Sequence, residues 1–277
     1  MRRWLPLAAL GALAAAIVLA ALAAPWVAPR SPLRIETASR LQPPGTLYRD
    51  GTVALLGTDQ VGRDVLSRIV HGARVSLTVG FAAVVVAGAI GLTVGLVSGY
   101  YAGWTDTLVM RLADIQLGFP GILLAIAITA VLGASVENLV VSLGVTRWVA
   151  YARLTRGVVL SLREREFVES ARALGASDLA IVARHIVPAV TTTLLILATI
   201  EVGRVIVAEA SLSFLGLGIE PPAPSWGGMV ADGRQYLFGA WWVSTFPGLA
   251  IGLTTLVFGL AGDRLRDYLD PRLRHAA

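Results

Sequence analysis

The sequence contains no lysine and no cysteine. All 23 basic residues are arginine, so a phosphate-binding loop that ends in Gly-Lys-Ser or Gly-Lys-Thr is impossible. The chain therefore does not bind ATP in the manner of P-loop proteins, and a lysine Schiff base is excluded as well. Without cysteine there are no disulfides, no thiol nucleophiles and no cysteine-ligated metal sites.

Histidine is also scarce. The three histidines, His71, His185 and His275, are far apart in the chain, and no His-Glu-x-x-His motif is present. No pair of aspartates lies in an apolar segment, so a membrane-embedded enzyme finds no support. We expect no metal site, no catalytic residues and no cofactor in this chain.

Charged residues make up 15% of the chain and hydrophobic residues 56%. Soluble domains contain about 25% charged and about 45–50% apolar residues. Five long segments carry no charge at all: Trp4 to Pro29, Val75 to Thr105, Ile115 to Val136, His185 to Ile200 and Gln235 to Gly262. Because a helix needs about 20 apolar residues to cross a membrane, this pattern predicts a membrane protein with several spans.

We predict an all-α membrane protein with six transmembrane helices. The spans are expected at Leu5 to Val27, Ser76 to Ser98, Ile115 to Gly133, Asn138 to Tyr151, Pro188 to Leu212 and Val243 to Gly262. With both termini and the segment Arg153 to Arg184 inside, the cytoplasmic side carries 13 arginines and the outer side eight. This excess favours cytoplasmic N and C termini. It also explains the net charge of +5 without nucleic acid as a partner.

The chain is expected to divide into three parts. Residues 1–74 hold the first span, an extracytoplasmic loop and an amphipathic segment; residues 75–263 form the core with a loop at about 153–187; residues 264–277 form a basic cytoplasmic tail. The first span is expected to stay attached as an anchor, although Ala21-Leu22-Ala23 resembles a signal-peptide cleavage site. The segment from Val61 to His71 is expected to be a short helix, either at the membrane surface or docked on the protein core.

Two features are expected within the spans. Gly91, Gly95 and Gly99 repeat every four residues, which predicts a flat helix face for close helix packing. Arg147 interrupts the fourth span, where a charge is costly unless it reaches the interface or faces the interior of the bundle.

The charged segment between the fourth and fifth spans predicts two short helices that meet at a glycine. Glu164 to Leu174 contains good helix formers, and Gly175 follows where a helix-ending glycine is expected. Ser177 is a natural N-cap, with Asp178 in the first turn of the second helix. Pro188 is expected about one residue beyond the end of that helix. This predicts a rigid exposed corner, a suitable shape for docking into a groove on a partner.

The same segment resembles the signature loop of permease subunits of bacterial binding-protein-dependent ABC importers. That pattern reads Glu-Ala-Ala, three residues, Gly, nine residues, then Ile, any residue, Leu and Pro. Glu169, Ala171, Gly175 and Pro188 match it at the right spacing, whereas other residues stand at three of its positions: Ser170, His185 and Val187.

Four further segments resemble the dipeptide, oligopeptide and nickel permease family, of the type of its second permease subunit: Leu56 to Leu77, Gly99 to Asp106, Ser161 to Glu169 and Glu209 to Gly227. The resemblance implies the permease fold of type I ABC importers with a cytoplasmic coupling helix in the bacterial inner membrane. It implies a second permease subunit, two ATPase subunits that bind the ATP, and an extracytoplasmic solute-binding protein as partners. Peptides, or small solutes such as nickel complexes or glutathione, are the implied cargo.

The resemblance also assigns roles to residues. ATPase coupling falls on the corner, where Glu169 and Gly175 are expected to fix the geometry: Glu169, Ala171, Gly175, Ala176, Ser177, Asp178 and Pro188. Three charges in the fifth span, Glu201, Arg204 and Glu209, are candidates for the substrate path. Glu201 and Arg204 are three residues apart and share a helix face, so a structural ion pair is the alternative. A secondary transporter or channel not driven by ATP remains the alternative function.

Overall fold

The computed structural model describes residues 4–269, so Arg272 and Arg274 of the expected basic tail lie outside the described residues. Within that range the chain is almost entirely helical, with one small hairpin. The helices begin with α1 (Trp4–Leu22), α2 (Ala24–Val27), η1 (Thr37–Ser39), α3 (Val65–Tyr101), α4 (Gly103–Leu117), α5 (Gly121–Leu132) and α6 (Val136–Leu162). They continue with α7 (Glu166–Ala173), α8 (Asp178–Ile181), the π-helical η2 (Val182–Ile186), α9 (Val187–Phe214), α10 (Trp226–Gly233), η3 (Arg234–Tyr236) and α11 (Trp242–Leu269). The strands β1 (Thr46–Leu47) and β2 (Val53–Ala54) pair antiparallel.

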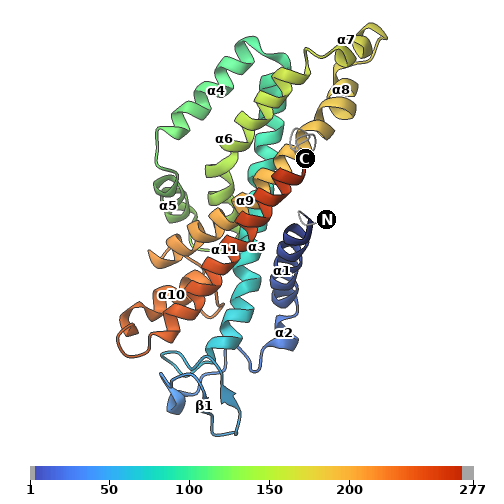
Figure 1. The fold of residues 1–277 in the computed structure, drawn as a ribbon. Helices are drawn as coiled ribbons and strands as arrows, with labels where there is room; N and C mark the ends of the chain where they lie inside the picture. Colours follow the sequence, from blue (N-terminus) through green and yellow to red (C-terminus); the bar gives the residue numbers. More distant parts are fainter. Residues whose placement is uncertain (1–3, 270–277) are drawn as a thin grey trace.

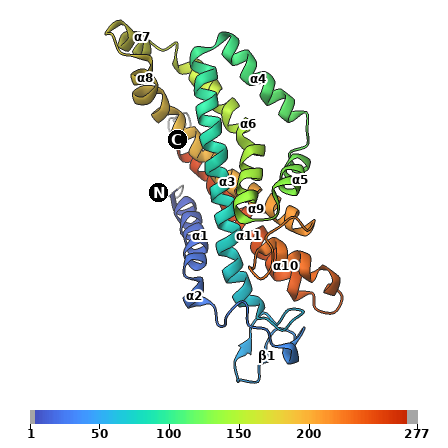
Figure 2. The ribbon, with the colours of Figure 1, turned by 180° about the vertical axis from the view of Figure 1, so that it is seen from behind.

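The helices form an elongated bundle with two distinct ends. In Figures 1 and 2, α7 and α8 project from one end, and the β1–β2 hairpin lies at the other. The long helix α3 runs between these ends, with α4 and α5 on one side of it and α1 on the other. The bundle therefore separates the charged loop after α6 from the loop after α2.

The six predicted spans all correspond to helices. By length and apolar composition, α3, the continuous segment Asp178–Phe214 and α11 can each cross a membrane, and α4 with α5 can form a fourth, broken span. The remaining two are α1, apolar over Leu7–Leu22, and α6, which is 27 residues long but carries several arginines. The chain is thus an all-α, multi-pass membrane protein.

The expected short helix at Val61 to His71 is wrong as a separate element. The chain forms a turn up to Asp64, and α3 starts at Val65 and continues for 37 residues. Asp64 caps this helix, since its Oδ2 accepts a hydrogen bond from the Ser67 amide at 2.7 Å. Val65 is fully buried, so the first turns of α3 are docked on the protein core, which was the second of the two expectations.

The third span also differs from its prediction. The residues between the second and third predicted spans, Tyr100 to Asp114, are mostly in α4, and the following helix α5 turns away from α4 by 88°. The break falls at Pro120, which lacks an amide proton and disfavours helical geometry in the residue before it. Arg153 and Arg156 of α6 hold α4 in place through ion pairs of 2.5 Å with Asp114 and Asp106 respectively.

The glycines of α3 pack against α6, as their four-residue repeat predicts. A Cβ atom on Gly91 would lie 2.3 Å from Tyr151 Cβ, and one on Gly95 would lie 2.6 Å from both Thr155 Cβ and the Ala152 carbonyl oxygen. Only glycine lets the two backbones come this close. Helices α3 and α6 therefore form one tightly packed unit.

The loop between α2 and α3 is held to the start of α3 by a polar network. Arg30 forms ion pairs with Glu36, at 3.1 Å, and with Asp50, and its guanidinium lies 3.6 Å from the centroid of the Tyr48 ring. Hydrogen bonds from Thr52, reinforced by Arg30, lower the pKa of Asp50 to about 2. Burial and the nearby Asp64 carboxylate raise the pKa of Tyr48 to about 12. The loop is thus a folded cap on this end of the bundle.

Candidate coupling corner and intramembrane charges

The corner between α7 and α8 is built by the backbone of the residues that the signature pattern singles out. The Ala176 amide donates to the Ala171 carbonyl oxygen and the Gly175 amide to that of Arg172, both at 3.0 Å. This pair of hydrogen bonds is a Schellman motif, which requires a left-handed residue between helix and exit. Gly175 supplies it with φ of +85° and has open space around its Cα.

The second arm of the corner starts as the sequence predicts. Ser177 accepts a hydrogen bond from the Ala180 amide at 3.4 Å, and Asp178 occupies the first turn of α8. The side chains of Val168 in α7 and Ile181 in α8 are fully buried. These contacts make the two arms a rigid unit.

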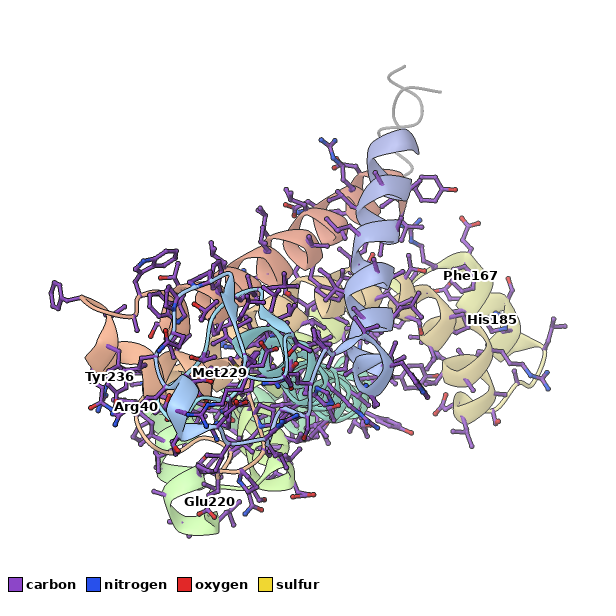
Figure 3. The ribbon with its side chains drawn as sticks, turned by 90° about the horizontal axis from the view of Figure 1, so that it is seen from below. Arg40, Phe167, His185, Glu220, Met229 and Tyr236 are labelled. Carbon is purple, nitrogen blue, oxygen red and sulfur yellow. The ribbon has the colours of Figure 1, made fainter. Side chains whose placement is uncertain are left out.

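A tyrosine at the end of α3 ties this unit to the bundle. Tyr100 Oη donates to Asp178 Oδ1 at 2.6 Å, and Arg172 Nη2 lies 3.4 Å from Tyr100 Oη. Phe167 of α7 lies beside His185 of η2, with ring centroids 6.0 Å apart (Figure 3). The sequence could not reveal the tyrosine contact, because 78 residues separate its two partners.

Glu169 and Pro188 lie differently from what was expected of them. The Glu169 carboxylate is exposed and makes no hydrogen bond to any residue between 4 and 269, so the side-chain hydrogen bonds at the corner involve Ser177 and Asp178 instead. Pro188 does not follow a helix end. It lies in the first turn of α9, which continues directly from α8 through the π-helical turn η2. A π-turn changes the hydrogen-bond spacing, so the helix can pass a residue that has no amide proton.

The outer tip of the corner presents apolar side chains. Leu174 is 88% exposed and Leu179 is 79% exposed, at a point where α7 and α8 project beyond the other helices. These two leucines make the tip of the corner apolar.

Glu201 of α9 lies between two arginines. Its carboxylate accepts from Arg147 Nη1 of α6 at 2.8 Å and from Arg204 Nη1 at 2.7 Å. Glu201 is 3% exposed, whereas the side chains of Arg147 and Arg204 are 28% and 62% exposed. The structure thus brings together Glu201 and Arg204, as their spacing suggested, and adds Arg147, whose charge faces the bundle interior.

Glu209 belongs to a separate site. It lies eight residues after Glu201 on the same helix, about 12 Å along the axis, and is completely buried. Its Oε1 accepts from Ser213 Oγ at 2.8 Å and its Oε2 from Ser76 Oγ at 3.2 Å. Ser76 Oγ in turn accepts from the Trp226 amide at 3.2 Å. This network joins α9, α3 and the start of α10.

Sequence reasoning missed Ser76, Ser213 and Trp226 as partners of Glu209. The four-residue spacing of Glu209 and Ser213 was a usable signal, since such residues share a helix face. It also missed α10, although Ser225 was a recognisable N-cap: its hydroxyl accepts from the Gly228 amide at 3.1 Å. Among the described residues, no group of three or more histidine or acidic side chains is arranged to hold a metal ion.

Comparisons with known proteins agree on one family. Residues 91–275 match the model of the binding-protein-dependent transport system inner membrane component. The chain is 43% identical over 261 residues to a di/tripeptide transport system permease protein of Pseudomonas aeruginosa, covering 94% of this chain and 86% of the relative. It is 47% identical over 219 residues to a glutathione transport system permease protein of Pectobacterium atrosepticum, covering 79% and 73%.

Solved structures resemble this fold. An inward-facing form of the MetNI methionine ABC transporter matches with a TM-score of 0.59 at 22% identity, covering 73% of this chain and 96% of the matched chain. An amino acid ABC transporter matches with a TM-score of 0.54 at 16% identity, covering 73% and 94%. At these identities the likeness concerns the fold, which is that of the permeases of type I ABC importers.

Proposed function

This chain belongs to the family of binding-protein-dependent transport system inner membrane components, and from this premise we propose that it carries di- and tripeptides into the bacterial cytoplasm. As a permease subunit of an ABC importer, it provides membrane helices to a translocation path and leaves ATP hydrolysis to other chains. The peptide cargo is supported by the relative from Pseudomonas aeruginosa, whose name specifies di- and tripeptides and whose sequence aligns with nearly the whole chain.

The observation that carries the coupling part of the proposal is the exposed corner at Gly175. Its Schellman motif makes it rigid, and Leu174 and Leu179 are exposed to solvent at its tip. A rigid projection with exposed apolar side chains is best explained by a partner that covers them. We assign it to an apolar groove on an ATPase subunit, with Ala171, Gly175, Ala176, Ser177 and Asp178 giving the corner its shape. Closure of the ATPases then displaces the corner and moves the attached helices as a rigid body.

The remaining partners follow from the same function. A second permease completes the path, two ATPase subunits supply the energy, and a solute-binding protein delivers the peptide on the outer side. The cap formed by the loop after α2, and the segment around α10, lie at the end of the bundle away from the corner (Figure 1). In the proposed orientation this end faces outward, so a binding protein would dock there.

The orientation in the inner membrane follows from the arginine bias and the corner. The corner and both termini face the cytoplasm in this proposal, and the cap faces outward. Reporter fusions after Pro29, near Ala223 and after Leu273 should read outside, outside and inside. A C-terminal reporter that is active only on the outer side would overturn this orientation.

The central experiment is reconstitution with the partners encoded alongside this chain. The complete importer, in vesicles with its binding protein, should take up a labelled dipeptide only when ATP is present on the corner side. Omission of ATP and a non-hydrolysable ATP analogue are the controls. Uptake that persists without ATP and follows an ion gradient would favour a secondary transporter instead.

We infer the roles of the three charged residues in α9 from their surroundings. Arg204, whose side chain is 62% exposed, and Glu201 are proposed to line the path, because they form a cluster open on one side. Glu209 is enclosed on all sides by α3, α9 and α10, so we propose that it holds the outer ends of these helices together.

A further inference from the structure

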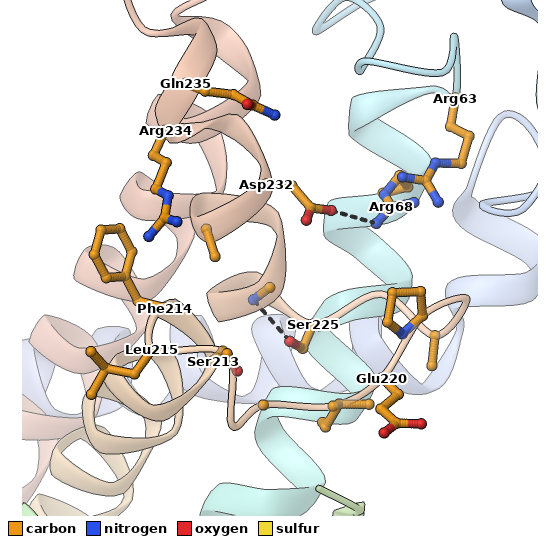
Figure 4. A pocket seen from close by; sticks show the side chains of 17 residues that line it. Arg63, Arg68, Ser213, Phe214, Leu215, Glu220, Ser225, Asp232, Arg234 and Gln235 are labelled. Atoms are coloured by element: carbon orange, nitrogen blue, oxygen red, sulfur yellow. Dashed lines mark hydrogen bonds and ion pairs between the residues drawn. The ribbon is translucent and has the colours of Figure 1, made fainter.

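A cavity of about 600 Å³ opens at the end of the bundle away from the coupling corner. Its walls come from the start of α3, from the segment that follows α9, and from α10 with η3 (Figure 4). Pockets for small molecules occupy about 300–1,000 Å³, so a peptide of two or three residues fits this volume.

One wall carries a buried arginine without a hydrogen bond at one of its nitrogens. Arg68 is 5% exposed, and its Nη1 makes no hydrogen bond to any described residue. Its two nearest carboxylates are too far for hydrogen bonding: Asp59 Oδ2 lies 3.6 Å from Nη1, and Asp232 Oδ2 lies 4.0 Å from Nη2.

Asp59 is occupied by other donors. It accepts from Arg63 Nε at 2.6 Å and from the Val61 and Arg63 amides at 2.9 Å each. Nη1 is thus enclosed beside a carboxylate that other donors occupy, whereas Nη2 lies toward Asp232, a residue that lines the cavity. Because arginine forms strong charge-assisted hydrogen bonds with carboxylates, and Asp232 lies too far from Nη2 for one, a ligand carboxylate at Nη2 suits Arg68.

The cavity also carries negative charge. Glu220 lies on the rim, exposed, and forms no ion pair within residues 4–269. The Asp232 side chain is 41% exposed and reaches Arg68 only at the limit of an ion pair, so a better acceptor can replace it. Figure 4 shows Glu220 and Arg68 on the same side of the cavity, on different segments of the wall.

We propose that this cavity binds the zwitterionic form of a short peptide on its way into the translocation path, with the peptide carboxylate at Arg68 and its ammonium group at Glu220. A free di- or tripeptide carries these two charges at its two ends, and the cavity offers the complementary pair. This inference rests on the proposed function, since it adds a subsite to a peptide importer.

The cavity is connected to the Glu209 network. Ser213 and Ser225 line it, and Ser213 donates to Glu209 at 2.8 Å. The wall of the cavity is thereby linked to α3 through Ser76, which hydrogen-bonds Glu209 and the Trp226 amide. A peptide that enters the cavity therefore contacts a wall held to the long helix α3.

The test measures binding of alanyl-alanine to the purified importer complex in nanodiscs, without its binding protein. Arg68→Gln and Glu220→Gln should each weaken binding roughly tenfold, the effect of losing one charge-assisted hydrogen bond. Glu137→Gln is the matched control, because it removes an exposed carboxylate that does not line the cavity. Alanyl-alanine amide should be insensitive to Arg68→Gln, and N-acetyl-alanyl-alanine should be insensitive to Glu220→Gln.

The outcomes separate the proposals. Equal affinity of wild type and Glu220→Gln for alanyl-alanine overturns the subsite, even if Arg68→Gln fails to fold. The subsite is also overturned if either variant weakens docking of the loaded binding protein while peptide affinity stays unchanged. Uptake of dipeptide by the wild-type importer is measured in parallel. If the wild type imports dipeptide but the variants bind it with unchanged affinity, only the subsite is overturned. If the wild type imports no dipeptide, the proposed function itself is overturned.

Discussion

Tyr100 Oη donates a hydrogen bond of 2.6 Å to Asp178 Oδ1, and this bond joins the end of α3 to the start of α8. Tyr100 is 8% exposed, whereas Asp178 is an exposed residue, so the bond is only partly shielded from water. In the proposed importer, Asp178 moves with the corner and Tyr100 moves with the bundle. The bond thus lies on the route by which motion of the corner reaches the long helix.

Removal of the Tyr100 hydroxyl should therefore loosen coupling without loss of the fold. Tyr100→Phe keeps the ring and its packing, and we expect a lower ratio of peptide imported to ATP hydrolysed at normal protein abundance. Tyr101→Phe is the matched control, because Tyr101 is the next residue, is 63% exposed and donates no hydrogen bond in the described structure. An unchanged ratio in Tyr100→Phe would show that the hydroxyl takes no part.

Gly175 should tolerate only residues that accept left-handed geometry. A β-branched residue at φ of +85° is strained by about 1–2 kcal/mol or more, so Gly175→Val should distort the corner. There is open space around Gly175, so insertion and abundance should stay normal while ATP-driven uptake falls. Gly175→Asn is the control, because asparagine adopts this conformation more readily. Uptake at wild-type level in Gly175→Val would contradict a rigid corner.

The contact between α3 and α6 should discriminate between neighbouring glycines. In Gly91→Ala the new methyl would lie 2.3 Å from Tyr151 Cβ, so the helices must separate at a cost of about 1–3 kcal/mol. In Gly88→Ala the nearest atom is a Tyr151 ring carbon at 3.7 Å, an ordinary contact. The melting temperature of the detergent-solubilised complex should fall in Gly91→Ala and stay unchanged in Gly88→Ala. Equal melting temperatures would count against the close packing.

Substitutions around Glu201 should show which of its two arginines needs it as an ion-pair partner. Glu201→Leu leaves Arg147 unpaired, and breaking a buried ion pair costs about 3–5 kcal/mol, so the abundance of folded protein should fall. Glu201→Leu with Arg147→Leu should restore abundance. Glu201→Leu with Arg204→Leu is the control and should not restore it, because Arg204 is mostly exposed and Arg147 remains unpaired. The reverse pattern would identify Arg204 as the true partner.

The cap after α2 should loosen at low pH. Asp50 has its pKa lowered to about 2 in the folded chain, mainly by hydrogen bonds from Thr52, against about 3.9 when unfolded. A lowered folded pKa means that the contribution of Asp50 to stability is present above pH 4 and is lost as the pH falls towards 2. Hydrogen exchange of the loop amides should accelerate over this range. In Asp50→Asn that acceleration should be absent, and an unchanged profile would exclude Asp50 as its cause.

Local features of the fold were predictable from the sequence because their causes are local. The glycine corner, the Ser177 N-cap and the glycine face of α3 follow from residues within one or two helical turns. The bounds of α3 and the 88° break between α4 and α5 were not predictable from the sequence, since apolar composition alone does not show where a span stops. Docking on the core keeps the polar first turns of α3 helical, and ion pairs to α6 keep α4 helical.

The sites were predictable only as far as single helices allow. Spacing places Glu201 beside Arg204, but Arg147 lies 54 residues earlier on α6. The Ser76 partner of Glu209 lies 133 residues away, on α3. The cavity at Arg68 joins three separate segments, and no pattern within any one of them reveals it. Contacts of this kind become visible only when the helices are packed.

The 37 residues of α3 form one uninterrupted rod, about 55 Å long at 1.5 Å per residue. The hydrocarbon layer is about 30 Å thick, so the rod reaches well past it. A tilt of about 10° around its midpoint would swing each tip by about 5 Å, in opposite directions. If α3 tilts as a rigid rod around its midpoint, a displacement of its Tyr100 end moves its Val65 end by a similar distance in the opposite direction.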